Sequence, residues 1–305
     1  MTQALHPSEQ RGQTLIDHLS HLAEQRTRHL IALLPTPPSL GIIGAAPEHD
    51  AVHSYARRLI RNAQKLGVTV HASVTLPTTH PADTSRLRDC DGVILLKPFH
   101  GAEPDLGHER DTEGLHPVHL DRLGGPHETL RPCTPNAALQ ILEASTGTLT
   151  GHTVIYGHGR TVGRPLTQML HSAGGTVSII SPGTPAHIEA ALLDSATGVI
   201  LACGVPGIYG PAQARAHHHV IDIGVTIEGG VIHGDADRRV AGTVHMLTPR
   251  RGGTGRLTSA LLMLQLARQA AARQPHALSA AALAPLNPGP PPLPHAPAPP
   301  RTAVS

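Results

Sequence analysis

Leucines and alanines recur at helical spacing near both ends of the chain. In residues 9–33, Leu15, Leu19 and Leu22 fall on one face of a helix. Residues 259–274 are rich in strong helix formers, and their leucines and alanines repeat at i, i+4 spacing. The pattern therefore predicts a long helix in each of these segments.

Between these two helices, short apolar runs alternate with amphipathic stretches. A helix is predicted over residues 52–67, where Gly67 ends it. Strands that alternate with helices are typical of an α/β protein, and the part of the chain after residue 150 has the pattern of a doubly wound half-Rossmann unit. The apolar runs have the length of buried parallel strands and lie at residues 38–45, 68–75, 91–99, 153–156, 176–180, 197–204 and 219–225.

The length and the composition predict two domains and a tail. The chain has 305 residues, and domains average about 150 residues. We expect a first domain over residues 1–147, completed by a terminal helix at residues 256–274, and a second domain over residues 148–255. Residues 275–305 are rich in proline and contain no acidic residue, so they are expected to form an extended, disordered tail.

A further helix is predicted at the connection between the two domains. Residues 130–145 carry Thr134 directly before Pro135. This pair is typical of an N-cap followed by proline at the first helical position. We therefore expect the helix to begin at Pro135 and to lead into the second domain.

The charge and the aromatic content disfavour two classes of partner. Lys and Arg number 24 and Asp and Glu number 22, which gives a net charge of +2, too even to favour nucleic acid or an acidic membrane surface. The chain has no Trp, one Phe and three Tyr, whereas RNA-binding surfaces stack bases on aromatic rings. No apolar run approaches the ~18 residues of a membrane span. We predict neither a nucleic-acid partner nor a membrane partner.

The cysteines and histidines give little sign of a metal or a disulfide framework. Cys90, Cys133 and Cys203 are odd in number and widely spaced, which favours a cytoplasmic protein over a secreted one. The 24 histidines are scattered and lack a spacing such as HExxH. We predict no metal site and interpret most of these histidines, including the run at residues 217–219, as solvated surface residues.

A glycine-rich turn follows the apolar run at residues 153–156. Gly157, Gly159 and Gly163 form a GxGxxxG pattern between the predicted strand and a predicted helix. Glycines at such a turn let a pyrophosphate approach backbone N–H groups at the positive end of the helix. The alternative is a tight connection that binds no nucleotide, but the strand before it and the helix after it favour the nucleotide site.

The turn and several other blocks, in order, resemble one enzyme family. GHGRTVGRP resembles the GxSxxVGxP turn of the methylenetetrahydrofolate dehydrogenase/methenyltetrahydrofolate cyclohydrolase family. Tyr55 lies on a segment ending QKLGV, like the Tyr-bearing helix of that family, and DGVILLKPF, RDTEGLHPVHLDRL, LRPCTP, VIDIGV and TPRRGGTGRLT resemble further family blocks. The resemblance runs from about residue 10 to residue 274.

The resemblance implies a fold, a reaction and a set of site residues. It implies a two-domain α/β enzyme with an N-terminal catalytic domain, a C-terminal Rossmann-type NAD(P)-binding domain, and a homodimer. It also implies that a tetrahydrofolate derivative is the substrate and that NADP, or alternatively NAD, accepts a hydride from it. Tyr55 and Glu113 are the implied catalytic residues. The implied cofactor-binding residues are Gly157, His158, Gly159, Arg160, Ser181 and Val225, and the implied substrate-binding residues are Tyr55, Leu59, Leu96, Glu113, Gly252 and Gly253.

The sequence departs from the family where proton transfer is expected. Leu59 stands where the family has a catalytic lysine, and Leu96 stands where it has the glutamine that partners this lysine. Because hydrocarbon side chains transfer no proton, we expect the hydrolysis of methenyltetrahydrofolate to be weak unless Arg58 or Lys97 takes over. Hydride transfer depends more on orientation than on a base. The alternative hypothesis is a non-catalytic or regulatory relative that binds folate or a nucleotide.

Other charged residues near these blocks allow two interpretations. Arg250, Arg251 and Arg256 attract folate carboxylates or cofactor phosphates in one interpretation and are solvated in the other. The carboxylates in the same blocks are expected to hold turns rather than to act on the substrate; they are Asp91, Asp111, Asp222 and Asp235.

Overall fold

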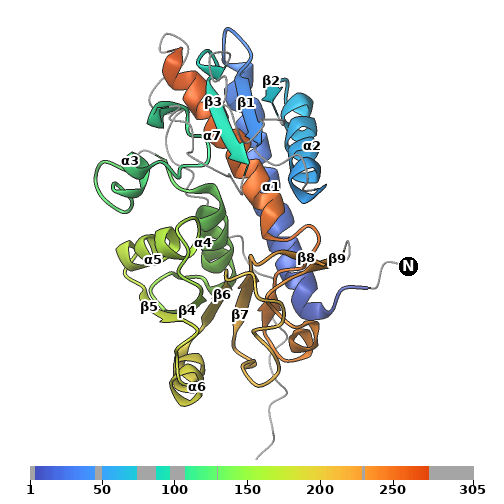
Figure 1. Cartoon of the computed structure of the whole chain (residues 1–305), viewed down its shortest axis with the longest axis vertical. Coiled ribbons are helices and arrows are strands. Elements are labelled where there is room, and N and C mark those ends of the chain that lie inside the picture. The colour runs from blue at the N-terminus through green and yellow to red at the C-terminus, as the bar shows by residue number, and fades with distance from the viewer. Residues whose placement is uncertain are drawn as a thin grey trace, which may run out of the picture.

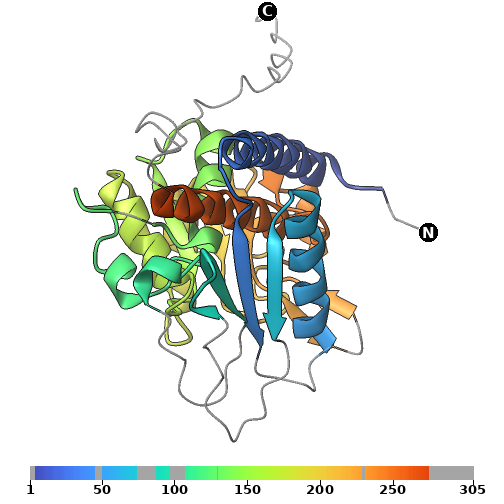
Figure 2. The same cartoon turned by 90° about the horizontal axis from the view of Figure 1, so that it is seen from above.

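The computed structural model describes residues 4–44, 50–73, 87–96, 107–128, 130–228 and 231–274. Two long helices, α1 (Pro7–Ala32) and α7 (Thr254–Arg273), lie side by side and join two parallel sheets. Figure 1 shows the two sheets in different parts of the molecule, and Figure 2 shows α1 and α7 lying next to each other. No helix in the described ranges is both long and apolar enough to cross a membrane.

The first sheet has three parallel strands in the order β2-β1-β3. Its strands are β1 (Ser39–Gly44), β2 (Thr69–Ser73) and β3 (Gly92–Leu96), and α2 (Asp50–Lys65) connects β1 to β2. Gly67 takes a φ of 78°, and the N–H of Val68 donates to the carbonyl of Ala63. These features form a glycine-dependent helix end, so the prediction that Gly67 ends this helix is confirmed.

The second sheet has five parallel strands in the order β10-β7-β6-β4-β5. The strand order reverses at β4, because β5 lies on one side of it and β6 on the other. Ligands of doubly wound proteins bind outside the carboxyl ends of the strands at such a reversal. The elements of this half are β4 (His152–Tyr156), α5 (Gly163–Ser172), β5 (Thr176–Ile180), α6 (Ala186–Ser195), β6 (Gly198–Leu201), β7 (His219–Asp222) and β10 (Met246–Leu247).

The other elements of the described chain are helices and a separate two-stranded sheet. Two short helical turns precede the central helix, and a two-stranded antiparallel hairpin follows β7. These elements are η2 (His108–Arg110), α3 (Pro117–Leu120), α4 (Cys133–Thr146), β8 (Thr226–Glu228), β9 (Val231–His233) and η3 (Arg238–Gly242).

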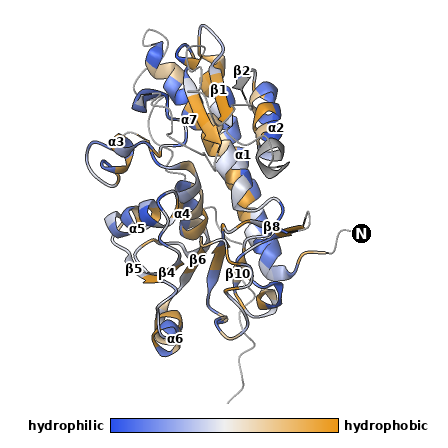
Figure 3. Ribbon diagram, viewed as in Figure 1, coloured by the Kyte–Doolittle hydropathy of each residue, from blue (hydrophilic) through white to orange (hydrophobic). Residues whose placement is uncertain are grey.

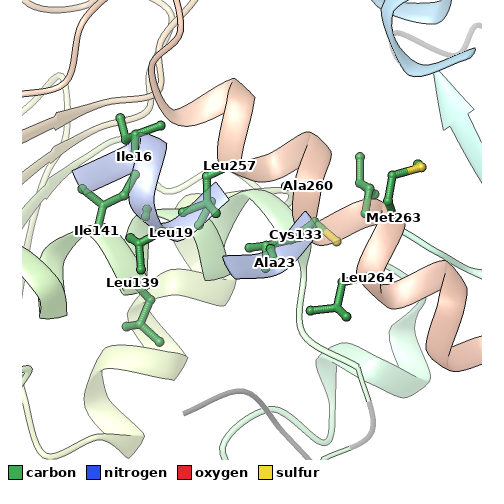
Figure 4. Packing of buried hydrophobic residues seen from close by; sticks show 14 of the residues in the cluster. Ile16, Leu19, Ala23, Cys133, Leu139, Ile141, Leu257, Ala260, Met263 and Leu264 are labelled. Carbon is green, nitrogen blue, oxygen red and sulfur yellow. The ribbon is translucent and has the colours of Figure 1, made fainter. Parts of the chain in front are cut away.

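One buried hydrophobic cluster runs through both halves. Side chains of α1, α4 and α7 interdigitate at its centre (Figure 4). The cluster continues into the first sheet through Ile42 and Ile94 and into the second through Ile155 and Ile221. In Figure 3 the central strand of the first sheet, β1, is mainly hydrophobic, while the helices that cover the molecule alternate between polar and apolar faces. A second cluster, which includes Tyr156, lies within the second sheet's half.

The start of α4 differs from its prediction. The helix begins at Cys133 with Pro132 as its N-cap, and no side chain caps it. The first helical turn closes when the N–H of Asn136 donates to the carbonyl of Pro132 at 2.9 Å. The prediction that Thr134 is the N-cap was therefore wrong, because Pro132 already supplies the carbonyl acceptor and Thr134 lies inside the first turn.

Candidate functional site

The glycine turn connects β4 to α5, as predicted. Gly157 takes a φ of 94°, and a Cβ there would lie 2.7 Å from the carbonyl oxygen of Ala202. Gly163 opens α5 and packs against the backbone of Gly157, so both positions require glycine. A Cβ at Gly159 would meet no atom within 4 Å. The space in front of the turn is therefore open, which fits a dinucleotide that approaches backbone N–H groups at the start of α5.

The other predicted cofactor residues lie along the same carboxyl edge. His158 and Arg160 are exposed in the glycine turn, and Ser181 is exposed directly after β5. The N–H of Gly157 donates to the carbonyl of Ile180, which brings the turn against the end of β5. Val225 follows β7 and is 64% exposed. All of these positions can reach a ligand outside the strand ends.

Two aspartates hold the backbone of this edge. Asp222 accepts hydrogen bonds from the N–H groups of Gly224, Asp235 and Ala236, at 3.0–3.1 Å. Burial raises the pKa of Asp222 to about 6. Asp235 is fully buried and accepts from the N–H groups of Cys203 and Gly204. The prediction that these carboxylates hold turns is confirmed for Asp222, which accepts from the N–H two positions on. Asp235 instead holds the segment after β6, which is distant in the sequence.

Tyr55 and Glu113 come together from distant parts of the sequence. Tyr55 lies on α2 and is half-buried, and Glu113 lies in the segment between η2 and α3. Burial first, and then the carboxylate of Glu113, raises the pKa of Tyr55 well above its ordinary value. At neutral pH the phenol therefore keeps its proton and acts as a hydrogen-bond donor.

The segment that carries Glu113 is fastened by its own side chains. Asp111 accepts from the N–H of Glu113 at 3.1 Å and from the N–H of His116 at 2.6 Å. The N–H of Cys133 donates to the carbonyl of Glu113 at 3.0 Å, which fixes the start of α4 beside it. As expected, Asp111 holds a turn. Asp91 instead accepts from the N–H of Ser39 at the start of β1, 52 positions away in the chain.

Two glutamines of α7 complete this attachment, and sequence reasoning missed them. Gln265 donates to the carbonyl of Thr112 at 2.9 Å, and Gln269 accepts from the hydroxyl of Thr112 at 2.9 Å. Both glutamines are buried. The sequence could have indicated them, because they are polar residues on an otherwise apolar helix face and buried amides require hydrogen-bond partners.

Leu59 and Leu96 lie in the hydrophobic core. Leu59 is 0% exposed, Leu96 is 2% exposed, and both belong to the cluster that joins the two sheets. A buried amine or amide at either position alone would need a hydrogen-bond partner. Their joint replacement by hydrocarbon leaves apolar side chains that pack. Lys97, the other candidate for proton transfer, lies outside the described residues.

The glycine loop before α7 links the two halves of the site. Gly252 takes a φ of 72°, and Gly253 packs against the carbonyl of Pro249. The hydroxyl of Thr254 donates to the carbonyl of Asp222 at 3.2 Å, which joins the start of α7 to the end of β7. The loop therefore places the first turn of α7 at the carboxyl edge of the second sheet.

The three arginines of this loop differ in what they contact. Arg250 donates to the carbonyl of Ala236 at 3.4 Å, and Arg256 forms an exposed ion pair with Asp17 of α1. Arg251 is exposed. The structural partners of Arg250 and Arg256 favour the interpretation that these two serve the fold.

Three histidines gather around η2 and α3, but their bonding does not suit a metal. The rings of His108, His116 and His119 lie 5.7–6.3 Å apart. The Nδ1 of His116 accepts from the N–H of Val118, which leaves the proton of the neutral ring on Nε2. Within the described ranges, no group of three His, Cys, Asp or Glu side chains is arranged to hold a metal ion.

Comparison with known proteins identifies similar sequences and folds. Residues 132–274 match the model of the tetrahydrofolate dehydrogenase/cyclohydrolase NAD(P)-binding domain. The bifunctional protein FolD of Deinococcus radiodurans is 34% identical over 241 residues, which cover 73% of this chain and 79% of that protein.

Two solved structures show the same fold at low sequence identity. A Trypanosoma brucei methylenetetrahydrofolate dehydrogenase-cyclohydrolase, complexed with NADP cofactor and inhibitor, superposes with a TM-score of 0.73 at 21% identity, covering 90% of this chain and 99% of the other. The NAD-dependent methylenetetrahydrofolate dehydrogenase of Saccharomyces cerevisiae superposes with a TM-score of 0.67 at 16% identity, covering 87% and 96%.

Proposed function

Since the chain belongs to the tetrahydrofolate dehydrogenase/cyclohydrolase family, we propose that it oxidises methylenetetrahydrofolate to methenyltetrahydrofolate with a nicotinamide cofactor and hydrolyses the product slowly. The observation that carries this proposal is the burial of Leu59 and Leu96 in the hydrophobic core. The dehydrogenation needs the two ligands held together, whereas the hydrolysis also needs a group that moves a proton.

The residues of the cofactor edge bind and orient. When bound, the nicotinamide cofactor accepts the hydride. Gly157 and Gly163 shape the turn, and Gly159 leaves the approach to it open. Asp222 and Asp235 fix the loops on either side through backbone N–H groups.

The residues of the folate side position the substrate. Tyr55 offers a ring and a hydroxyl that stays protonated, and Glu113 offers a carboxylate fixed by the bonds of its segment. Gly252 and Gly253 shape the loop before α7, whose first residue bonds to the end of β7. None of these described groups replaces the amine of a lysine at position 59, so water attack on methenyltetrahydrofolate lacks a proton carrier there.

The cofactor we propose is NADP, with NAD as the alternative. Neither the glycine turn, residues 157–164, nor the segment after β5, residues 181–185, contains an acidic side chain. An acidic residue after the second strand is what usually binds the ribose hydroxyl of NAD. Arg160 and His158 add cationic or neutral donors instead, which suit a 2′-phosphate.

We propose a homodimer formed through the second half of the molecule. Ile227, Val231 and Ile232 of the β8–β9 hairpin are 40–55% exposed, and Ile227 and Ile232 are paired across its two strands. A group of large apolar side chains on a hairpin is suited to contact with a second copy. Sedimentation measurements on the Ile232→Lys variant test the proposal, since this variant is expected to be monomeric.

We also propose the boundaries of the two domains and the cellular location. The lobes comprise residues 1–147 with 256–274 and residues 148–255, and each holds one parallel sheet. Cys90, Cys133 and Cys203 are free thiols, which supports a cytoplasmic location.

A two-channel assay tests the proposed reaction. Purified protein is incubated with methylenetetrahydrofolate and NADP or NAD, and reduced cofactor and methenyl absorbance are both followed. Cofactor reduction with a lasting methenyl signal is the expected result. Rapid loss of the methenyl signal would reject slow hydrolysis. Silence in both channels would support the alternative function, a non-catalytic binding protein, which the loss of the lysine and glutamine also favours.

A further inference from the structure

Arg58 lies over Tyr55 and extends toward the opposite helix. It follows Tyr55 by three positions on α2, so the two side chains share a helix face. The central carbon of its guanidinium is 5.2 Å from the centroid of the Tyr55 ring. One of its terminal nitrogens is 3.9 Å from the place that a Cβ would take at Gly255, in the first turn of α7. The side chain of Arg58 therefore extends from Tyr55 to the first turn of α7.

Its charge differs from that of an amine at position 59. Leu59 points into the core, whereas Arg58 is exposed on the Tyr55 face. A guanidinium stays protonated throughout the range in which enzymes work, while an ammonium loses its proton near its pKa. The positive charge beside Tyr55 is therefore permanent, and it cannot deliver or accept a proton.

We propose that Arg58 is a positioning residue, which holds the ring of Tyr55 against the folate and supplies a fixed positive charge. The rate of hydride transfer therefore does not fall as the pH is raised above neutrality. The proposal rests on the proposed dehydrogenase function. It adds that the site has exchanged a proton-transferring cation for one that only orients.

The other groups around Tyr55 are consistent with this behaviour. Glu113 from the segment after η2, Cys133 from α4 and Arg58 from α2 are the charged and titratable groups that act on Tyr55. Asp111 acts in turn on Cys133. Burial raises the pKa of both Tyr55 and Cys133, so both stay protonated in mildly alkaline solution.

Steady-state kinetics across pH test the proposal. The rate of cofactor reduction is measured from about pH 7 to 10, below and around the pKa of a lysine, for the parent protein and for Arg58→Lys, Arg58→Gln and Arg61→Gln. Arg61 is the matched control, because it is an exposed arginine one turn further along α2. Thermal unfolding of each variant shows that it is folded.

The expected results separate charge from packing. The parent and Arg61→Gln are expected to show no alkaline decline, and Arg58→Lys is expected to match the parent near neutrality and to lose activity as its amine deprotonates. Arg58→Gln is expected to raise the KM for methylenetetrahydrofolate about tenfold and to leave the KM for the dinucleotide unchanged.

Three outcomes would overturn the proposal, and one would instead reject the function. Parent-like kinetics in Arg58→Gln would remove the positioning role. A flat alkaline profile in Arg58→Lys would show that the charge does not matter. The rate of cofactor reduction by the parent could fall at alkaline pH, and Lys97→Gln could abolish this fall. That result would assign the cation to Lys97. A parent protein that reduces neither NADP nor NAD with methylenetetrahydrofolate would reject the proposed function itself.

Discussion

The surroundings of Tyr55 and of Asp222 differ in whether they retain polar side chains. Near Tyr55, the positions of a lysine and a glutamine hold Leu59 and Leu96, both in the core. The side chain of Asp222 instead accepts from three backbone N–H groups. Backbone groups always need a partner, whereas a group that serves only the chemistry can be removed together with its partner.

The largest change in stability is expected when a lysine replaces the buried leucine at position 59, near Tyr55. Leu59→Lys places an ammonium at a fully buried position and is expected to cost about 3–5 kcal/mol of unfolding free energy, because the charge has no partner. Leu59→Lys combined with Leu96→Gln is expected to recover part of this loss and to raise hydrolysis up to about 10²-fold. Urea unfolding and decay of methenyl absorbance measure the two effects.

The Leu96→Gln variant alone is the control for that experiment. Strictly additive destabilisation by the two changes would show that the two side chains do not interact. No gain in hydrolysis in a folded double variant would show that the rest of the proton-transfer arrangement has also been lost.

His218 is fully buried, so the interpretation of the run at residues 217–219 as solvated surface histidines was wrong for this residue. The second sheet is expected to respond to acid through it. His218 accepts from the Tyr209 hydroxyl and the Arg215 N–H, donates to the Leu193 carbonyl, and has its pKa lowered to about 4, mainly by burial. Because the unfolded chain binds this proton near pH 6.5 and the folded protein does not, stability falls as pH drops below that value. The loss attributable to His218 at pH 5 is about 2 kcal/mol.

Comparison with His218→Gln isolates this contribution. The unfolding free energy of the variant is expected to depend less steeply on pH between about 6.5 and 4 than that of the parent. Equal slopes in the two proteins would contradict the pKa that burial imposes on His218.

Asp222 is expected to act in the opposite direction. Its pKa is raised to about 6 by burial, so the folded protein takes up this proton before the unfolded chain does. The stability of the folded state therefore rises as pH falls below about 6, by about 1.4 kcal/mol at pH 5. Urea unfolding of the parent and Asp222→Asn at pH 7 and pH 5 measures it. The difference in unfolding free energy between the parent and the variant should be larger, in favour of the parent, at pH 5 than at pH 7. No increase would disprove the prediction.

The smallest effect is expected at the surface ion pair between Arg256 and Asp17. Both side chains are nearly half exposed, so solvent screens their attraction. Arg256→Gln is expected to change the unfolding free energy by about 0.5 kcal/mol or less, and to leave the KM for folate unchanged because Arg256 serves the fold. A raised KM would return Arg256 to the interpretation in which it attracts substrate carboxylates.

The sequence predicted those parts of the site that depend on local pattern. The glycine turn was readable because Gly157 and Gly163 stand between a strand and a helix pattern, and the structure places the turn there. The turn-holding role of Asp222 was readable because an aspartate after a strand commonly accepts from the N–H two positions on, here that of Gly224.

The missed features depend on packing between distant segments. The bridge from Arg58 to Gly255 requires the crossing of α2 and α7, which no local pattern specifies. The bonds of Gln265 and Gln269 to Thr112 depend on how α7 lies against the segment after η2. The start of α4 was misplaced because both Pro132 and Pro135 are compatible with a first turn, and the chain geometry selects between them.

The single core that passes through α1, α4 and α7 has a thermodynamic consequence. Because Ile94 of one sheet and Ile221 of the other belong to the same buried cluster, neither sheet can melt without exposing apolar surface of its neighbour. Denaturation should follow one cooperative transition. A dinucleotide that contacts only the second sheet should accordingly protect amide hydrogens of the first from exchange with solvent.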